Sequence, residues 1–426
     1  MFIYDELKSL EIQNRSIKVG LVGAGFMGQG IVEVMESTPG MVVAAIADIN
    51  IERAAVSFQA VNVTNFKEIK SAGEARSINF SEERVISSNY RVIPEIDCLD
   101  FIIEATGVPE IGAEVAYYSI MNGKHIGMMN VETDVTIGYY LNTLAKKTGT
   151  VYTVCTGDEP AAIKEIYDFV KTFGFKVVAC GKGKNNPLEV SATPLTLEKK
   201  AEDSGLNPRM LTEFVDGSKT MVEMSCVANA TGLTIDRRNM HGPRTQVDKL
   251  TEVFTLKERG GILMNEGVVD YAIGDIAPGV FVVAKHEGAL VNKTLQYLKI
   301  GEGPDYLFYR PYHLTNIEVP VSVASGYLYK KSSIAASSPP TTEVITIAKK
   351  NLEKGENIDY IGGFTVYAGL ERYDYAAKER LLPFGLCEGA KLTAAVEKGK
   401  PVTYDQVEIK DTFILGLRKL QDRLYG

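Results

Sequence analysis

A glycine-rich turn between a short apolar run and an amphipathic stretch is the feature that most constrains the fold of this chain. Residues 23–28 read Gly-Ala-Gly-Phe-Met-Gly; they follow the apolar run 17–22 directly and precede a stretch of helical spacing at 29–37. A second apolar run, 41–47, ends in Asp48, twenty residues beyond the last glycine of the turn. A strand, a GxGxxG turn, a helix and an acidic residue in this order are typical of a dinucleotide-binding βαβ unit.

Each part of this motif has a physical role in binding a dinucleotide. Gly23 permits the tight turn from strand to helix, Gly25 lets backbone N–H groups approach a pyrophosphate, and Gly28 lets the helix pack close to the sheet. Asp48 favours the ribose hydroxyls of NAD, whereas Arg53 would accept the phosphate of NADP, so both cofactors stay open. The predicted cofactor-binding residues are Gly23, Gly25, Phe26, Met27, Gly28, Asp48, Arg53, Thr106, Gly107, Asn130 and Glu132.

The composition excludes several classes of function. The 426-residue chain is 45% hydrophobic and 23% charged, with a net charge of −8 and a pI near 5.4, which argue against nucleic-acid binding. Its five cysteines show no CxxC spacing, and no apolar run is long enough to span a bilayer. We expect a cytoplasmic protein with neither nucleic acid nor membrane as partner. We also expect a homo-oligomer that acts on a small molecule. Several cations described below could bind a phosphate, which favours a phosphorylated substrate.

The order of predicted elements divides the chain into three parts. The first alternates strand and helix and predicts an α/β class, with a doubly wound parallel Rossmann sheet whose sixth strand is 176–180. The second mixes a long helix with strand-like segments and predicts an α+β domain for substrate binding or oligomerisation. The third predicts a small β domain with tight turns. The predicted domains are residues 1–185, 186–340 and 341–426.

Four local predictions can be checked directly against a structure. We predict a helix over 65–75 and one continuous helix over 208–231, closed by a glycine. The segment 316–324 predicts a strand. Thr133 or Asp134 is predicted to cap the helix that begins near residue 135.

The loop after the predicted sixth strand is the first candidate for chemistry. Residues 181–187 carry two lysines and two amides at the edge where a parallel sheet binds its ligand. Lys182, Lys184 and Asn185 are therefore predicted to hold an anionic group or to polarise a carbonyl for hydride transfer. A solvated basic loop is the alternative.

The second candidate lies on the long predicted helix. Asp216, Lys219 and Glu223 stand at i, i+3 and i+7, so a continuous helix places them on one face. The following residues are apolar nearly all round, which predicts a buried helix whose charges need partners or a function. A catalytic group and a structural ion pair both stay open. If the reaction uses Mg or Mn, Asp216 and Glu223 are the available hard ligands.

Three further residues are candidates for substrate binding. Arg310 precedes His313 by three residues, and together they could bind an anion or relay a proton, although a histidine is often a core residue. Arg237 could contact a substrate phosphate or complement the end of the preceding helix.

Several groups of residues carry a resemblance to a known family. The glycine-rich turn, the loop Glu104-Ala105-Thr106-Gly107 and the segment 130–134 resemble the homoserine dehydrogenase type of dinucleotide domain. The Lys-Gly turns and the segment 382–385 (Leu-Pro-Phe-Gly) near the end of the chain resemble a SAF domain, a small β-clip module. The resemblance implies an NAD(P)-dependent oxidoreductase acting on CH–OH groups. One branch of such proteins comprises deoxyxylulose phosphate reductoisomerase-like enzymes of isoprenoid synthesis. The Gly-Thr-x-Asn motif of homoserine binding is replaced by residues 181–187.

The predicted reaction is the reductive isomerisation of deoxyxylulose phosphate to methylerythritol phosphate with NADPH. It follows mainly from the resemblance and is consistent with several cations that could hold a phosphate. A homoserine or sugar-acid dehydrogenase and a non-catalytic NAD(P)-binding sensor are the alternatives.

Overall fold

The computed structural model describes residues 3–424, which form two compact units built from segments distant in sequence. The first unit contains the described residues up to Ala161, the segment Leu314–Ser337 and the described residues from Thr412 on. The second contains Ala162–His313 and Ser338–Asp411. Both predicted boundaries, at 185 and 340, fall inside segments of the second unit, so the units divide the chain differently from the predicted domains.

The first unit is built around a parallel sheet, as predicted. Its seven strands lie in the order β3-β4-β2-β1-β5-β6-β7, and every pairing is parallel. The order reverses between β1 and β5, which is the switch point where doubly wound sheets bind their ligands. The bounds are β1 Ile17–Val22, β2 Met41–Ala47, β3 Phe66–Glu68, β4 Arg84–Ser87, β5 Phe101–Glu104, β6 His125–Met128 and β7 Tyr152–Val154.

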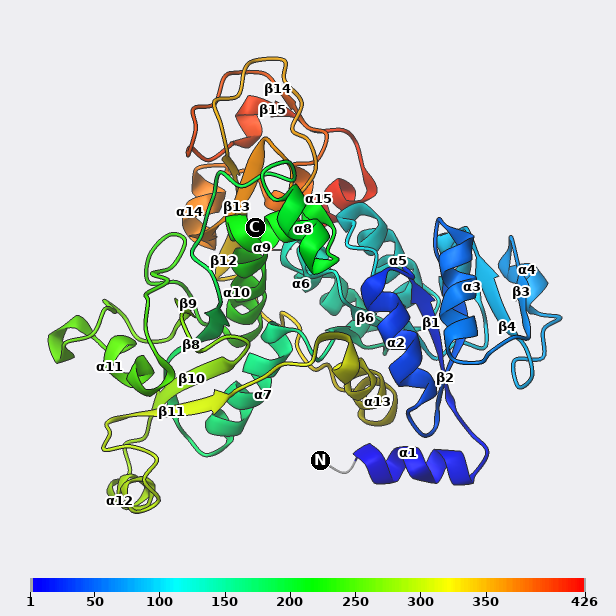
Figure 1. Ribbon diagram of the computed structural model, residues 1–426, viewed down its shortest axis with the longest axis horizontal. Helices are drawn as coiled ribbons and strands as arrows, with labels where there is room; N and C mark the ends of the chain where they lie inside the picture. Colours follow the sequence, from blue (N-terminus) through cyan, green and yellow to red (C-terminus); the bar gives the residue numbers. More distant parts are fainter. Residues whose placement is uncertain (1–2, 425–426) are drawn as a thin grey trace. The chain divides into compact units, whose positions relative to one another are not determined.

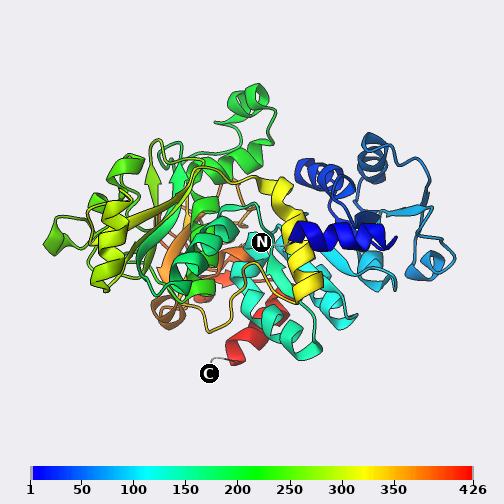
Figure 2. The same cartoon turned by 90° about the horizontal axis from the view of Figure 1, so that it is seen from below.

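Helices complete the first unit. Figure 2 shows α1 beside α13, two helices that are far apart in the sequence. The core between these helices and the sheet is closely packed and includes Phe101, Val319 and Val323, none of which is exposed to solvent. The helices are α1 Ile3–Ile12, α2 Phe26–Glu36, α3 Ile51–Ala60, α4 Ala72–Ala75, α5 Pro109–Met121, α6 Val131–Thr148, α13 Val319–Tyr329 and α15 Phe413–Arg423, with 3₁₀ turns η1 Tyr90–Glu95 and η4 Thr315–Glu318.

Three local predictions were wrong in this unit. The segment 65–75 is not one helix, because its start pairs with β4 as the edge strand β3 and only α4 is helical. The segment 316–324 is helical and not a strand: its valines at i and i+4 face the core, which overrides their β-propensity. Helix α6 begins at Val131, and its N-cap is Asn130, whose side chain accepts a hydrogen bond from Thr133 N.

The second unit contains a mixed four-stranded sheet in the order β11-β10-β8-β9. Strand β8 (Lys176–Lys184) pairs in parallel with β9 (Val268–Ile273) and antiparallel with β10 (Val280–Lys285), which pairs antiparallel with β11 (Asp305–Arg310). The prediction that 176–180 is the sixth strand of the parallel sheet was therefore wrong. Alternation along the chain identified a strand but could not specify which sheet receives it.

The long helix predicted over 208–231 is two helices. Helix α9 (Pro208–Asp216) ends at Gly217, whose φ of 89° breaks the helix, and α10 (Ser218–Thr231) follows and ends at Gly232. Helix α10 packs against β9, β12 (Thr342–Ala348) and β13 (Val366–Arg372) (Figure 1). The other helices are α7 Glu159–Thr172, which begins in the first unit, α8 Glu198–Ser204, α11 Leu250–Val253, α12 Ala289–Tyr297 and α14 Tyr373–Lys378, with 3₁₀ turns η2 Val247–Lys249, η3 Lys257–Arg259, η5 Phe384–Leu386 and η6 Tyr404–Gln406.

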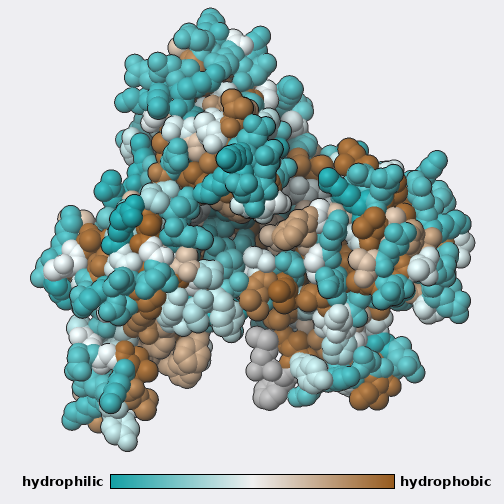
Figure 3. All heavy atoms as spheres, viewed as in Figure 1, coloured by the Kyte–Doolittle hydropathy of each residue, from teal (hydrophilic) through white to brown (hydrophobic). Residues whose placement is uncertain are grey.

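The segment predicted as a small β domain forms short strands and isolated bridges. Strands β12 (Thr342–Ala348) and β13 (Val366–Arg372) pair antiparallel, as do β14 (Lys391–Leu392) and β15 (Val407–Glu408). The surface around β14 and β15 is mostly hydrophilic (Figure 3). Its identity as a SAF domain stays a prediction. Across residues 3–424, no helix combines the length and apolar character needed to cross a membrane.

Candidate functional site

The glycine-rich turn of the first unit joins β1 to α2, and its three glycines meet different surroundings. A Cβ on Gly28 would lie 2.0 Å from Gly23 O, and one on Gly23, which has a φ of 99°, would lie 2.7 Å from Ala105 backbone atoms. A Cβ on Gly25 would meet nothing within 4 Å. A side chain at Gly23 or Gly28 would therefore clash with the protein backbone, whereas Gly25 leaves open space at the N-terminus of α2. This geometry fits a pyrophosphate.

Asp48 lies at the end of β2 and contacts this turn. Its Oδ2 accepts a hydrogen bond from Ala24 N at 2.7 Å, and its Oδ1 accepts one from Asn50 N at 2.8 Å. Arg53 is exposed on α3, Phe26 is 78% exposed, and Met27 is half-buried. The structure thus brings Asp48 to the turn, and the cofactor contacts of these residues remain predictions.

A buried carboxyl group lies at the carboxyl end of β5. Burial raises the pKa of Glu104 to about 7, against the opposing effect of hydrogen bonds from Thr106. Glu104 Oε1 accepts from Thr106 N at 2.8 Å, whereas its Oε2 and Asn130 Nδ2 form no hydrogen bond of normal geometry with any described residue. Gly107 is exposed beside this group, and Glu132 is buried in the first turn of α6. Glu104 was not among the predicted site residues.

In the second unit, one row of residues crosses the sheet. Val280 on β10 is paired with Arg310 on β11 and with Lys182 on β8, and Lys182 is paired with Tyr271 on β9. Paired residues on neighbouring strands project from the same face. Two cations and a phenol therefore share one face of this sheet, which the sequence analysis could not show.

Lys182 points toward helix α10. Its ammonium group contacts Glu223, and Lys219 Nζ lies 3.8 Å from the same carboxylate. The side chains of Lys182 and Glu223 are 9% and 1% exposed, so this is a buried cluster and not a solvated face. The structure brings together three of the predicted catalytic residues.

Lys184 lies two residues further along β8, on the same face. Burial lowers the pKa of Lys184 to about 8, with a smaller contribution from the positive charge of Lys182. Its Nζ donates to Phe214 O at 2.7 Å and to Asn186 Oδ1 at 3.1 Å. Asn185 follows on the exposed loop. Lys184 is therefore a buried amine that is held by carbonyl oxygens, and the amine can exchange a proton near neutral pH.

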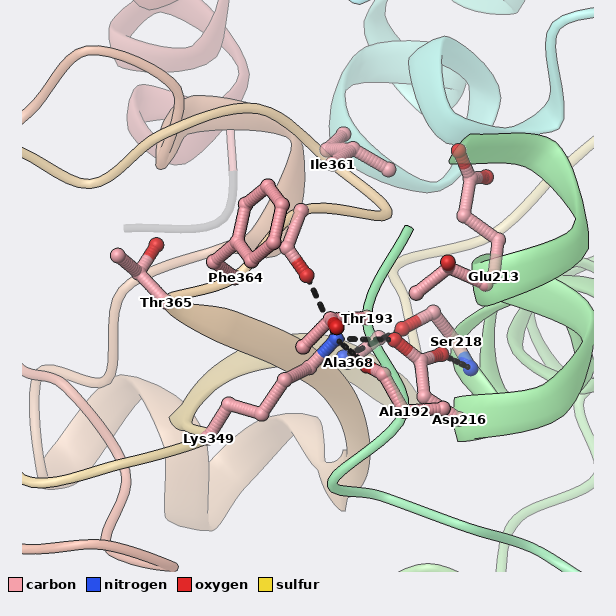
Figure 4. A network of polar contacts seen from close by, with 12 residues as sticks. Ala192, Thr193, Glu213, Asp216, Ser218, Lys349, Ile361, Phe364, Thr365 and Ala368 are labelled. Carbon is pink, nitrogen blue, oxygen red and sulfur yellow. Dashed lines mark hydrogen bonds and ion pairs between the residues drawn. The ribbon is translucent and has the colours of Figure 1, made fainter. Parts of the chain in front are cut away.

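Asp216 does not share a helical face with Lys219 and Glu223. Because the helix breaks at Gly217, the carboxylate turns toward Lys349, whose Nζ lies 2.9 Å from Asp216 Oδ2 (Figure 4). Lys349 Nζ also donates to Ala192 O at 2.8 Å and to Gly363 O at 2.9 Å.

Carboxylates paired in this way do not fit a divalent cation. Asp216 contacts the ammonium of Lys349, and Glu223 contacts that of Lys182. The prediction that Asp216 and Glu223 are available to bind Mg or Mn therefore does not fit this arrangement.

The sequence did not lead us to predict a second polar cluster, which surrounds Asp270 on β9. Asp270 Oδ2 lies 2.8 Å from His241 Nδ1, and His241 Nε2 lies 3.3 Å from Asp236 Oδ2. Asp270 Oδ1 also accepts from Gly242 N at 3.0 Å and Tyr271 N at 2.8 Å. One signal was available: Asp270 is a charged residue within the apolar run 268–273.

The three residues predicted to bind substrate lie in different surroundings. Arg310 Nη1 lies 3.0 Å from Glu165 Oε2 at the end of the row that contains Lys182. Arg237 is exposed in the loop after α10, and His313 is half-buried three residues beyond β11. The structure therefore places Arg310 in the row of residues that contains Lys182.

The fold and the glycine-rich turn define a dinucleotide-binding α/β protein. Residues 157–319 match a family model described as "Oxidoreductase DRL, catalytic domain". This range contains every residue predicted to be catalytic or to bind substrate. Together, the turn and the match indicate an NAD(P)-dependent oxidoreductase.

Comparisons with other proteins add weaker similarities. A homoserine dehydrogenase from Thiobacillus denitrificans is 13% identical, over 91% of this chain and 98% of that chain, with a TM-score of 0.41. A scyllo-inositol dehydrogenase from Lactobacillus casei with bound NAD(H) and scyllo-inositol is 10% identical, over 63% and 74%, with a TM-score of 0.37. A DOX-P reductoisomerase in complex with NADPH, fosmidomycin and magnesium is 13% identical, over 51% and 59%, with a TM-score of 0.35. Similarities this weak carry no argument about the substrate. No curated protein matches the chain.

Proposed function

We propose that the protein reduces a small carbonyl compound that bears an anionic group, with NAD(P)H as the hydride donor. The specific reaction proposed is the reductive isomerisation of deoxyxylulose phosphate to methylerythritol phosphate. The observation that supports an anionic substrate is the buried cluster of Lys182, Lys184, Lys219 and Glu223 within the range similar to an oxidoreductase catalytic domain.

The charge of this cluster favours an anion. The ammonium groups of Lys182 and Lys219 lie beside the Glu223 carboxylate, and Lys184 is a third lysine on the same face of the sheet. Ammonium groups gathered where little solvent reaches them are stabilised when an anion binds beside them. A phosphate or carboxylate bound here would be held by charge-assisted hydrogen bonds.

Lys184 is the residue we assign to proton transfer. A general acid works best when its pKa lies near the working pH, and burial brings the pKa of Lys184 to about 8. At neutral pH the amine carries the proton, which it can donate to a substrate oxygen as negative charge develops there. Lys182 stabilises the same developing charge.

The first unit holds the dinucleotide in this proposal. Gly25 and the backbone N–H groups at the start of α2 bind the pyrophosphate, while Asp48 binds the adenosine ribose and keeps the turn in place through Ala24. When bound, the reduced nicotinamide supplies a hydride. The proton that accompanies this hydride comes from Lys184.

A test separates this function from its alternatives. Purified protein is incubated with NADPH or NADH and, separately, with deoxyxylulose phosphate, aspartate semialdehyde or a keto sugar acid, in buffer with and without added magnesium. Oxidation of the cofactor with formation of methylerythritol phosphate, identified by mass spectrometry, supports the proposed reaction. Turnover of another carbonyl compound instead would replace the substrate. Saturable cofactor binding without any turnover would favour a sensor.

A further inference from the structure

The hydroxyl group of Tyr271 is an unusual feature of the second unit. Tyr271 is 4% exposed, yet its hydroxyl forms no hydrogen bond with any described residue. This oxygen is not fully enclosed by the protein, so it retains access to solvent. Buried tyrosines generally find a partner for this group. An unpartnered hydroxyl on a buried ring points to a ligand.

The surrounding backbone holds this ring in one position. Asp270 Oδ1 accepts hydrogen bonds from Tyr271 N and Gly242 N, and Asp270 Oδ2 contacts His241 Nδ1. Gly242 has a φ of 56°, and a Cβ there would lie 2.2 Å from Tyr271 Oη. Only glycine leaves room for the phenol at this point. The Asp270–His241 pair therefore fixes both the strand and the loop that enclose the ring.

Tyr271 also belongs to the row of residues that carries the lysine cluster. It is paired with Lys182 across β8 and β9, which places their Cα atoms roughly 5 Å apart, with both side chains on one face. Burial raises the pKa of Tyr271 to about 12, with a contribution from Asp270, so the phenol keeps its proton at neutral pH. A neutral phenol beside an ammonium group can donate a hydrogen bond where Lys182 supplies charge.

We propose that Tyr271 contacts the substrate and that its hydroxyl donates a hydrogen bond to an oxygen of the anionic carbonyl compound held by Lys182. This inference rests on the proposed function and adds a residue to its substrate site. It assigns the Asp270–His241 pair as positioning residues, which act by holding Tyr271.

The test uses Tyr271→Phe, which removes only the hydroxyl oxygen, and a matched control on the same sheet. Tyr309→Phe is that control, because the Tyr309 hydroxyl already donates to Ile276 O at 2.9 Å. For the compound that the wild type turns over, we expect Tyr271→Phe to lower kcat/KM by roughly tenfold to a hundredfold. Tyr309→Phe should leave kcat/KM within about twofold of wild type.

A binding measurement complements the kinetics. Protein labelled with 3-fluorotyrosine is titrated with deoxyxylulose phosphate, homoserine and gluconate, and the ¹⁹F resonance missing from Tyr271→Phe is assigned to Tyr271. We expect this resonance, and not that of Tyr309, to move with the compound that supports turnover. Turnover with an unmoved resonance and unchanged kcat/KM in Tyr271→Phe overturns the inference and leaves the proposed function standing. If no compound is bound or turned over, the proposed function fails and the inference fails with it.

Discussion

Replacing Lys349 by methionine tests whether the Asp216–Lys349 pair is structural. The Lys349 side chain is 2% exposed and that of Asp216 is 0% exposed. Methionine retains most of the apolar stem but removes the charge and the three hydrogen bonds to Asp216, Ala192 O and Gly363 O. The substitution therefore leaves a buried carboxylate whose remaining hydrogen bond comes from Ser218 N.

The expected loss follows from this environment. Removing one partner of a buried ion pair costs about 3–5 kcal/mol, because the other charge stays buried without compensation. The double variant Asp216→Asn/Lys349→Met carries no such charge and should recover part of the loss. Lys350→Met is the matched control: Lys350 pairs with Glu356 but is 53% exposed, so its loss should stay below about 1 kcal/mol.

Urea unfolding followed by circular dichroism measures these differences. The chain contains no tryptophan, so the far-ultraviolet signal is the better probe. We expect Lys349→Met to lower the free energy of unfolding by about 3–5 kcal/mol. A loss no larger than that of Lys350→Met would refute the reasoning, and so would a double variant less stable than Lys349→Met.

Four further predictions concern the two units. Gly28→Ala places a Cβ 2.0 Å from Gly23 O and should weaken NADH binding at least about tenfold in a fluorescence titration; unchanged binding would contradict the fit of the turn. Asp48→Ala should shift the ratio of Kd values toward NADP by about tenfold in calorimetry, and an unchanged ratio would remove Asp48 from the ribose site. Burial raises the pKa of Glu104 from the ordinary value of 4.5 to about 7, so between these two pH values Glu104 holds a proton in the folded state that it lacks in the unfolded state. The folded wild type therefore loses up to about 3 kcal/mol of stability as the pH rises through this range. Glu104→Gln should lack this slope in urea unfolding at pH 5 and 8, and an identical slope would exclude Glu104 as its cause. Lys219→Met should lower kcat roughly a hundredfold without changing cofactor affinity, and wild-type turnover would make Lys219 structural.

The first unit could be predicted largely from the sequence because its signals are local. The strand 17–22, the turn 23–28 and the strand 41–47 all lie within residues 17–47, and the structure places each as expected. The errors occur where a tertiary contact decides. Val319 and Val323 have strand propensity but face the core from a helix, and the helix over 208–231 breaks at one residue, Gly217.

The candidate site of the second unit could be predicted only in part. Glu223 was identified because charges on an apolar helix need a partner or a function, whereas Lys182 and Lys184 were identified from their place after a predicted strand. Asp216 was predicted to share a helical face with Lys219 and Glu223, but this prediction assumed a continuous helix, and the helix breaks at Gly217. Tyr271 could not be found, since its place beside Lys182 depends on the register of strands almost ninety residues apart in the chain.

Transfer of deuterium from the cofactor to a product tests the central claim most directly. The protein is incubated with NADPH that carries deuterium at C4 of the nicotinamide and with deoxyxylulose phosphate, and the products are analysed by mass spectrometry. We expect methylerythritol phosphate that is one mass unit heavier than the product made with unlabelled NADPH. The absence of any deuterated product from this or another anionic carbonyl compound, under conditions where NADPH is bound, would contradict the assignment of the protein as a hydride-transferring enzyme.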